Sequence, residues 1–136
     1  MSQVAIRSKV TTALAAWAAA KSPALTIARE NQPFTKPINY GTFLELTVIP
    51  ADTFTSTLDG TGRRFLGEVI INVWTNDGIG TGVAEALAEE IAQLFPRVPL
   101  NYLPVVIESW PTLKRSIMMD EGYRVSTVCF NYRAEY

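Results

Sequence analysis

The sequence predicts an α+β protein, in which two helices pack on one face of a mainly antiparallel sheet of about five strands. Two adjoining segments carry this prediction. Residues 63–74 are rich in β-branched and aromatic side chains, which is typical of a long strand. Residues 83–95 place apolar side chains at steps of three and four, which is typical of an amphipathic helix. A glycine-rich turn at 76–82 joins them, and residues 1–136 are few enough for a single domain.

The chain is expected to begin with a helix that Ser2 caps and Pro23 ends. Five apolar side chains recur along one face of this helix: Ile6, Val10, Ala13, Leu14 and Trp17. A secretory signal is the alternative, but Thr11 and Thr12 interrupt the apolar run and alanine dominates it. No run is long enough to span a membrane, so no membrane association is expected.

Shorter patterns predict the other strands. Apolar and polar side chains alternate over residues 42–49, and Pro50 is expected to close that strand. The polar residues 51–62 then form a hairpin arm or loop, at a length where connections are often functional. The remaining strand candidates are 25–30, 105–110 and 123–132, with a turn at 118–122. The predicted order is therefore α-β-β-β-α-β-β.

The long central strand carries apolar residues on both faces. Val69, Ile71 and Val73 are assigned to the face that the helices cover. The opposite face then receives Leu66, Ile70 and Trp74, joined from the neighbouring strand by Phe43 and Ile49. So many large apolar groups do not suit a solvated sheet face. Two explanations stand: long loops cover this face, or another subunit does.

Composition excludes several classes of function. Charged residues make up 18% of the chain, against roughly 25% in an average soluble domain, so part of the surface is expected to lie against other subunits. The net charge of −1 gives no general attraction to nucleic acid. The chain has no histidine and a single cysteine, Cys129, which argues against an intrachain disulfide and a soft-metal site.

The turn Gly78-Ile79-Gly80-Thr81-Gly82 does not fit a nucleotide-binding loop. Val83 stands where a dinucleotide fingerprint needs glycine, and no lysine follows as in a phosphate loop. Cys129 lies in an alternating strand with no histidine to activate it. Glu85 and Glu89 share a helix face, as exposed like charges often do. We therefore expect no cofactor, no metal and no enzymatic activity.

Charge is distributed unevenly along the chain. Residues 1–36 carry five basic side chains and one acidic one, whereas residues 77–95 carry four acidic side chains and no basic one. Unlike charges on two surfaces of one protomer favour head-to-tail contact between copies. Solvated helix faces are the alternative explanation.

A series of short motifs, taken in order, gives the chain a resemblance to a known family. The motifs are Trp17-Ala18-Ala19-Ala20, Glu30-Asn31-Gln32-Pro33-Phe34, Leu46-Thr47-Val48-Ile49-Pro50-Ala51-Asp52-Thr53, Arg64-Phe65-Leu66-Gly67, Gly78-Ile79-Gly80-Thr81-Gly82-Val83-Ala84-Glu85, Leu94-Phe95-Pro96, Gly122-Tyr123-Arg124-Val125 and Asn131-Tyr132-Arg133. The chain resembles the tail terminator (tail completion) proteins of long-tailed bacteriophages. The resemblance covers nearly the full length, with the poorest match at residues 99–119.

The resemblance implies a structural protein of virion assembly. Such proteins form a ring, typically a hexamer, that caps the end of the tail tube, stops its polymerisation and presents a surface for head attachment. The implied partners are further copies of the chain, the tail tube protein and a head-completion or connector protein, with DNA only passing through the lumen. The implied location is the head-proximal end of the virion tail, and assembly would take place in the host cytoplasm. The protein could equally be encoded by a prophage. Another head-tail connector, a minor tail component and a small-molecule-binding α+β domain are the alternatives.

In the light of this resemblance we predict two sets of functional residues. Contacts with other subunits or with the tube are expected at Phe43, Ile49, Asp52, Phe54, Arg63, Arg64, Leu66, Ile70 and Trp74. Acidic side chains that line the lumen, and so let DNA pass without sticking, are expected at Glu85, Glu89 and Glu90. A charged residue in place of Trp74 should leave a folded monomer that does not form rings.

Overall fold

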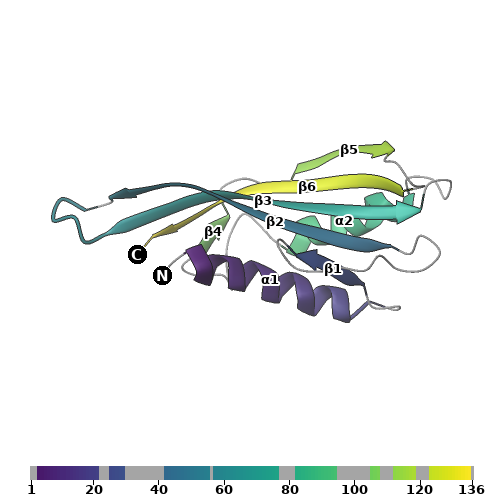
Figure 1. Cartoon of the computed structure of the whole chain (residues 1–136), viewed down its shortest axis with the longest axis horizontal. Helices are drawn as coiled ribbons and strands as arrows, with labels where there is room; N and C mark the ends of the chain where they lie inside the picture. Colours follow the sequence, from purple (N-terminus) through teal and green to yellow (C-terminus); the bar gives the residue numbers. More distant parts are fainter. Residues whose placement is uncertain are drawn as a thin grey trace.

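In a computed structural model of the protein, the described residues form two helices and a strongly extended sheet (Figure 1). The structure describes residues 3–21, 25–29, 42–55, 57–76, 82–94, 105–107, 112–118 and 123–135. Its elements are α1 (Gln3–Ala19), β1 (Thr26–Arg29), β2 (Phe43–Thr55), β3 (Arg63–Asn76), α2 (Gly82–Leu94), β4 (Val105–Ile107), β5 (Thr112–Met118) and β6 (Tyr123–Glu135). The predicted α+β class is confirmed.

The sheet has the strand order β1-β2-β3-β6-β4, and β5 pairs with β6 as well. Strand β1 runs parallel to β2, and all other described pairs are antiparallel. Within the described residues the sheet therefore has six strands, one more than the sequence pattern indicated. The additional strand is β5, whose residues show no clear apolar alternation. Backbone pairing with β6, such as Leu113 opposite Val128, places it in the sheet.

Strand β2 does not end at Pro50, as the sequence pattern had predicted, but continues to Thr55. Strand β1 pairs only with residues 43–46 of β2, so among the described residues the far side of β2 has no partner strand at Pro50. An edge position of this kind is one where a strand tolerates proline. An irregular register between Pro50 and Thr53 follows, and the strand then resumes pairing with β3.

The hydrophobic core lies between the two helices and one face of the sheet. Val69, Ile71 and Val73 of β3 are fully buried, as predicted for the helix-covered face. The flanking strands and the helices complete the core with Leu44, Leu46, Val48, Val128, Phe130, Tyr132, Ile6, Val10, Leu14, Ala88 and Ile91. Full burial of each large apolar side chain contributes roughly 1.5–3 kcal/mol, so this layer holds the two helices on the sheet.

The helix stripes that the sequence predicted supply this core. Ile6, Val10 and Leu14 of α1 are buried, and Ala13 and Trp17 pack partly against them. Ser2 and Pro23, which were expected to cap and end the first helix, lie outside the described residues. In α2 the buried residues are Ala84, Ala88 and Ile91. Both stripes face the same side of the sheet, and neither described helix lies on the opposite side (Figure 1).

Candidate functional site

The face of the sheet that carries no helix is here called the outer face. Its side chains come from alternate positions of the three long strands β2, β3 and β6. On β3 these positions are half-buried: Leu66, Glu68, Ile70, Asn72 and Trp74. The predicted placement of Leu66, Ile70 and Trp74 opposite the core is thus confirmed by the alternation of burial.

Three aromatic rings cluster at one end of the outer face. Phe43 stacks on Trp74 with ring centroids 5.4 Å apart and an interplanar angle of 11°. Tyr123 meets both rings edge-on, at 5.4 Å from Phe43 and 5.8 Å from Trp74. Such pairs contribute about 0.5–1.5 kcal/mol each beyond area burial. Phe43 is only 3% exposed, so it supports this end of the sheet and offers little surface to a partner.

A row of polar side chains crosses the outer face next to the aromatic cluster. The Asn72 side-chain amide donates to Glu45 Oε1 over 2.8 Å, and the Thr127 hydroxyl donates to Asn72 Oδ1 over 2.7 Å. The three residues are register partners on β2, β3 and β6. The outer face is therefore banded, with polar groups between the aromatic cluster and the next apolar row. Strand register decides this pairing, so sequence patterns alone did not indicate it.

Beyond the polar row, apolar side chains continue toward the far end of the sheet. Cys129 lies opposite Ile70 and is buried as a free thiol, which agrees with its predicted role as a small packed strand residue. Ile49 is 46% exposed. A hollow of about 350 Å³ opens here, lined by Ile49, Ala51, Leu66, Gly67, Glu68, Asn131 and Tyr132. This half of the outer face is the more accessible one.

The hairpin of β2 and β3 extends beyond the part of the sheet that the helices cover (Figure 1). We call residues 51–64 the arm. Phe54 on the arm is 52% exposed, and Leu58 near its tip is fully exposed. Arg63 is exposed and Arg64 half-buried, and the Asp52 side chain lies outside the described part of the structure. The sequence prediction of an arm over this segment agrees with the structure, although Leu58 was not singled out.

Hydrogen bonds within the tip of the arm fix its shape. Asp59 Oδ1 accepts from the Thr61 amide over 3.1 Å and from the Thr61 hydroxyl over 2.9 Å, and it also accepts from the Thr57 hydroxyl. The Gly62 amide donates to Thr57 Oγ1 over 2.8 Å. These bonds, that of Thr57 above all, lower the pKa of Asp59 below its ordinary value of 3.8. Gly60 completes the turn with φ of 78°, a conformation that suits glycine. The arm therefore presents Leu58 on a preformed turn.

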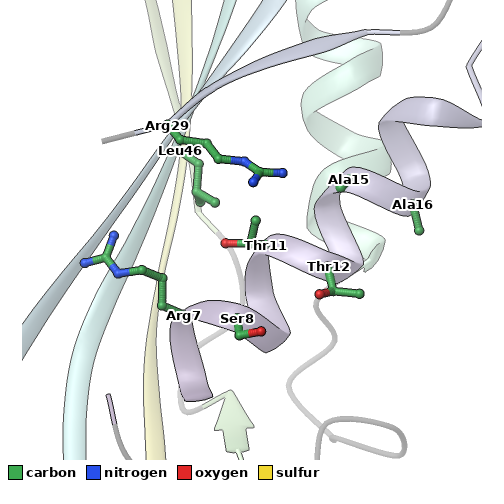
Figure 2. Close-up of a pocket in the computed structure, with 8 residues that line it drawn as sticks. All are labelled: Arg7, Ser8, Thr11, Thr12, Ala15, Ala16, Arg29 and Leu46. Atoms are coloured by element: carbon green, nitrogen blue, oxygen red, sulfur yellow. The ribbon is translucent and has the colours of Figure 1, made fainter. Parts of the chain in front are cut away.

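A groove runs between α1 and the β1 edge of the sheet (Figure 2). It has a volume of about 690 Å³ and is lined by Arg7, Ser8, Thr11, Thr12, Ala15, Ala16, Arg29 and Leu46. The Arg7 guanidinium donates to the Val48 carbonyl oxygen over 3.0 Å. Figure 2 shows Arg29 extending from the sheet toward Thr11. The sequence signal for this groove is that the exposed positions of α1 carry no charge: Val4, Ser8, Thr12, Ala16 and Ala19.

The acidic residues of α2 do not share one environment. Glu85 and Glu89 are exposed. Glu90 forms an ion pair with Lys21, whose Nζ also lies 5.2 Å from the centroid of the Trp17 ring. Glu90 therefore links α2 to the end of α1. A single chain contains no ring, so a position of these three glutamates on a lumen stays a prediction.

No group of three or more potential metal-binding side chains occurs among the described residues. No described helix is long and apolar enough to cross a membrane. Of the turn predicted at 76–82, Asn76 ends β3 and Gly82 begins α2, and residues 77–81 lie outside the described part of the chain. What the structure offers to a partner is surface: the outer face, the arm and the groove.

A sheet with one face that no described helix covers, together with a projecting, preformed arm, is suited to a subunit of a protein assembly. A family model described as "Phage tail terminator protein" matches residues 5–130, and the chain belongs to this family. It is accordingly a structural protein of a phage tail, with its place in the virion. The family is a structural one and is generally not enzymatic.

Two solved structures have a similar fold. One has a TM-score of 0.81 and 29% sequence identity, with coverage of 100% of this chain and 97% of its own. A second belongs to the virion of a native gene transfer agent particle, with a TM-score of 0.63, 21% identity and coverage of 93% and 92%. The second likeness concerns the fold. No curated protein matches the chain.

Proposed function

We propose that the protein forms a closed ring that caps the end of the phage tail tube, stops tube polymerisation and provides the surface for head attachment. The observation that carries this proposal is the arm, which leaves the body of the protein with Phe54 half-exposed and Leu58 fully exposed. Exposed apolar side chains contribute little to the stability of an isolated chain. Burying them against a partner removes their surface from water and favours binding. Family membership supports the tail as the place of that partner.

In this proposal the partners are further copies of the chain, typically six, together with the tail tube protein and a head-completion or connector protein. Ile49, Leu66 and Ile70 on the accessible half of the outer face contribute to contacts with subunits or tube, as do Phe54, Arg63 and Arg64 on the arm. Asp52 belongs to the same surface by its position in the chain. Trp74 and Phe43 contribute from within the aromatic cluster, by keeping the end of the sheet in shape. DNA only passes through the lumen.

Capping needs no chemistry beyond binding. One side of the ring binds the last tube subunits, and the other side offers the next tube ring no matching surface. A preformed arm favours this role because the entropy of ordering its tip is not lost again on binding. The hydrogen bonds around Asp59 are the basis for that preorganisation.

The test is a tube assembly experiment. Purified tail tube protein is allowed to polymerise with and without the present protein, and tube lengths are measured by electron microscopy. The wild type should shorten the tubes and appear as a ring at one end. Leu58→Asp should lose the effect, whereas Ala20→Asp, which adds the same charge at an exposed position off the arm, should retain it. Tubes of unchanged length with the wild type would refute capping.

Two alternatives predict other results. A different head-tail connector or a minor tail component would bind the virion without limiting tube length. A small-molecule-binding domain would gain thermal stability with its ligand, whereas an assembling protein gains stability with its own concentration. Melting curves over a range of protein concentration distinguish these cases.

A further inference from the structure

The two helices lie over opposite halves of the sheet. Helix α1 contacts β1 and β2, whereas α2 contacts β3, β5 and β6. Strand β1 is one end of the strand order, and β4 and β5 lie at the other. Each helix therefore has one flank toward the other helix and one flank toward a lateral side of the protein (Figure 1). Copies set side by side would bring the α1 flank of one against the α2 flank of the next.

The lateral flank of α1 is basic and has space. Of the charged residues that the structure describes, Arg7 and Arg29 line the groove on this flank and no acidic one does. Its helix wall consists of Ser8, Thr11, Thr12, Ala15 and Ala16, whose small side chains leave the volume of about 690 Å³ open. Among the described residues no carboxylate pairs with Arg29, which is exposed at the edge strand (Figure 2).

The lateral flank of α2 is acidic. Glu90 marks the flank that faces α1, because it pairs with Lys21. Successive residues of a helix are rotated by about 100°, so Glu85 lies about 140° around the axis from Glu90, and Glu89 about 100° in the same direction. Both are exposed. The two glutamates are one turn apart and form a single acidic strip away from α1.

We infer that the groove of one copy receives the acidic flank of α2 from the next copy, with Glu85 and Glu89 facing Arg29. The contact is head-to-tail, so its repetition builds a ring from one kind of interface where the rotation between neighbouring copies closes. Small side chains on the groove wall let the incoming helix approach closely. Charge complementarity favours this partner surface, because the basic grooves of two copies would repel each other. The inference rests on the proposed ring and places Glu85 and Glu89 between copies instead of on the lumen.

The test uses two variants that should fail alone and succeed together. In Arg29→Glu the residue that faces the incoming helix becomes acidic while Arg7 stays basic, and in Glu85→Lys/Glu89→Lys the facing strip of α2 becomes basic. Each variant alone should need at least about ten times more protein for half-maximal ring formation, measured by sedimentation at low salt. An equimolar mixture should restore assembly, because residue 29 of each copy then faces side chains of opposite charge on α2 of the next copy. Lys9→Glu, a charge reversal on α1 at a residue that does not line the groove, should leave the wild-type concentration dependence.

The outcomes separate the inference from the ring proposal. Wild-type rings together with unaffected single variants would overturn the inference and leave the ring standing. If the rings of Glu85→Lys/Glu89→Lys also gained affinity for duplex DNA, the glutamates would belong to the lumen. A wild type that stays monomeric with and without tail tube protein would overturn the ring itself and the inference with it. If a charge reversal unfolds the chain by circular dichroism, Arg29→Gln and Glu85→Gln/Glu89→Gln should weaken assembly in the same direction, and unchanged assembly would overturn the inference.

Discussion

Gly67 of β3 lies directly against the ring of Tyr132 on β6: a Cβ atom on residue 67 would stand 2.3 Å from the Tyr132 hydroxyl oxygen. The two residues are register partners in the sheet, and Gly67 also pairs with Pro50 on β2. Tyr132 is fully buried. The irregular register after Pro50 begins at the same level. The boundary between the helix-covered body and the arm thus depends on the Tyr132 side chain, which packs directly on the backbone of Gly67.

This contact predicts that Gly67→Ala destabilises the protein. The added methyl group requires the buried Tyr132 ring to shift, and overpacking of this kind costs about 1–3 kcal/mol. The free energy of unfolding in urea, followed by circular dichroism, measures the loss. Gly82→Ala is the matched control, because a Cβ there meets nothing within 4 Å and the residue lies in the first turn of α2. Equal stability of the two variants would contradict the packing seen at Gly67.

The Tyr132 hydroxyl predicts a loss of stability at alkaline pH. Burial raises the pKa of Tyr132 above its ordinary value of 10.0, although the nearby Arg7 charge lowers it in part. A raised folded-state pKa means that the native state holds the proton more tightly than the unfolded state. The resulting stabilisation is complete below pH 10 and is lost as the pH rises through the folded-state pKa.

Absorbance of the tyrosinate at alkaline pH measures this titration. The wild type should show a component that ionises above pH 10, and Tyr132→Phe should remove that component. Unfolding measured at pH 9 and above should show a steeper decline of stability for the wild type than for Tyr132→Phe. A parallel decline would mean that Tyr132 does not titrate differently in the two states.

A substitution at the tip of the arm should loosen the turn locally and leave the global stability of the protein unchanged. Asp59→Ala removes the acceptor for the Thr61 amide and hydroxyl, so the turn should open more often. Amide hydrogen exchange should become faster at Thr61 and Gly62, with the melting temperature of the body unaltered. Leu58→Ala is the control, since the exposed Leu58 side chain does not take part in these hydrogen bonds. Exchange that is as slow in Asp59→Ala as in Leu58→Ala would show that the bonds do not hold the turn.

The same turn should depend on pH in the opposite sense from Tyr132. The pKa of Asp59 is lowered by its hydrogen bonds, so the carboxylate supports the turn at pH values above 3.8. This support is lost as the pH falls through the lowered folded-state pKa. A carboxylate resonance at Asp59 that titrates with an ordinary pKa would contradict the hydrogen-bonded turn.

The fold class and the two faces of the central strand could be predicted because they depend on periodicity. A period of two along β3 separates Val69 and Ile71 from Ile70, and the structure retains that separation. Strand β5 could not be predicted in this way, because its place depends on backbone pairing with β6 and not on a pattern of its own. The predicted end of β2 at Pro50 was wrong for a related reason. Whether a proline ends a strand depends on the neighbouring strands, which a local sequence pattern does not specify.

Surface residues were harder to assign than core residues. Leu58 and the groove beside Arg29 were missed because exposure and concavity arise only when distant segments come together. Phe43 was grouped correctly with Trp74 on one face, but the stacking that buries it required the register of β2 on β3.

The aromatic cluster changes what a substitution at Trp74 can reveal. Trp74 was expected to act in ring formation without affecting the fold, yet its ring stacks on Phe43 and meets the edge of Tyr123. Trp74→Ala should therefore lower the free energy of unfolding by about 2 kcal/mol, somewhat below the usual loss for a fully buried tryptophan. Urea unfolding followed by circular dichroism measures this loss independently of tryptophan fluorescence.

Ile70→Ala provides the comparison for Trp74→Ala. It lies on the same face of the same strand and is also half-buried, but it is outside the aromatic cluster. We expect a smaller loss of about 1 kcal/mol, because fewer contacts are removed. If both variants are folded and only Ile70→Ala impairs ring formation, the accessible half of the outer face is the contact surface and Trp74 serves the fold. If Trp74→Ala is as stable as the wild type and forms no rings, the tryptophan contacts the partner itself and the aromatic cluster is dispensable for folding.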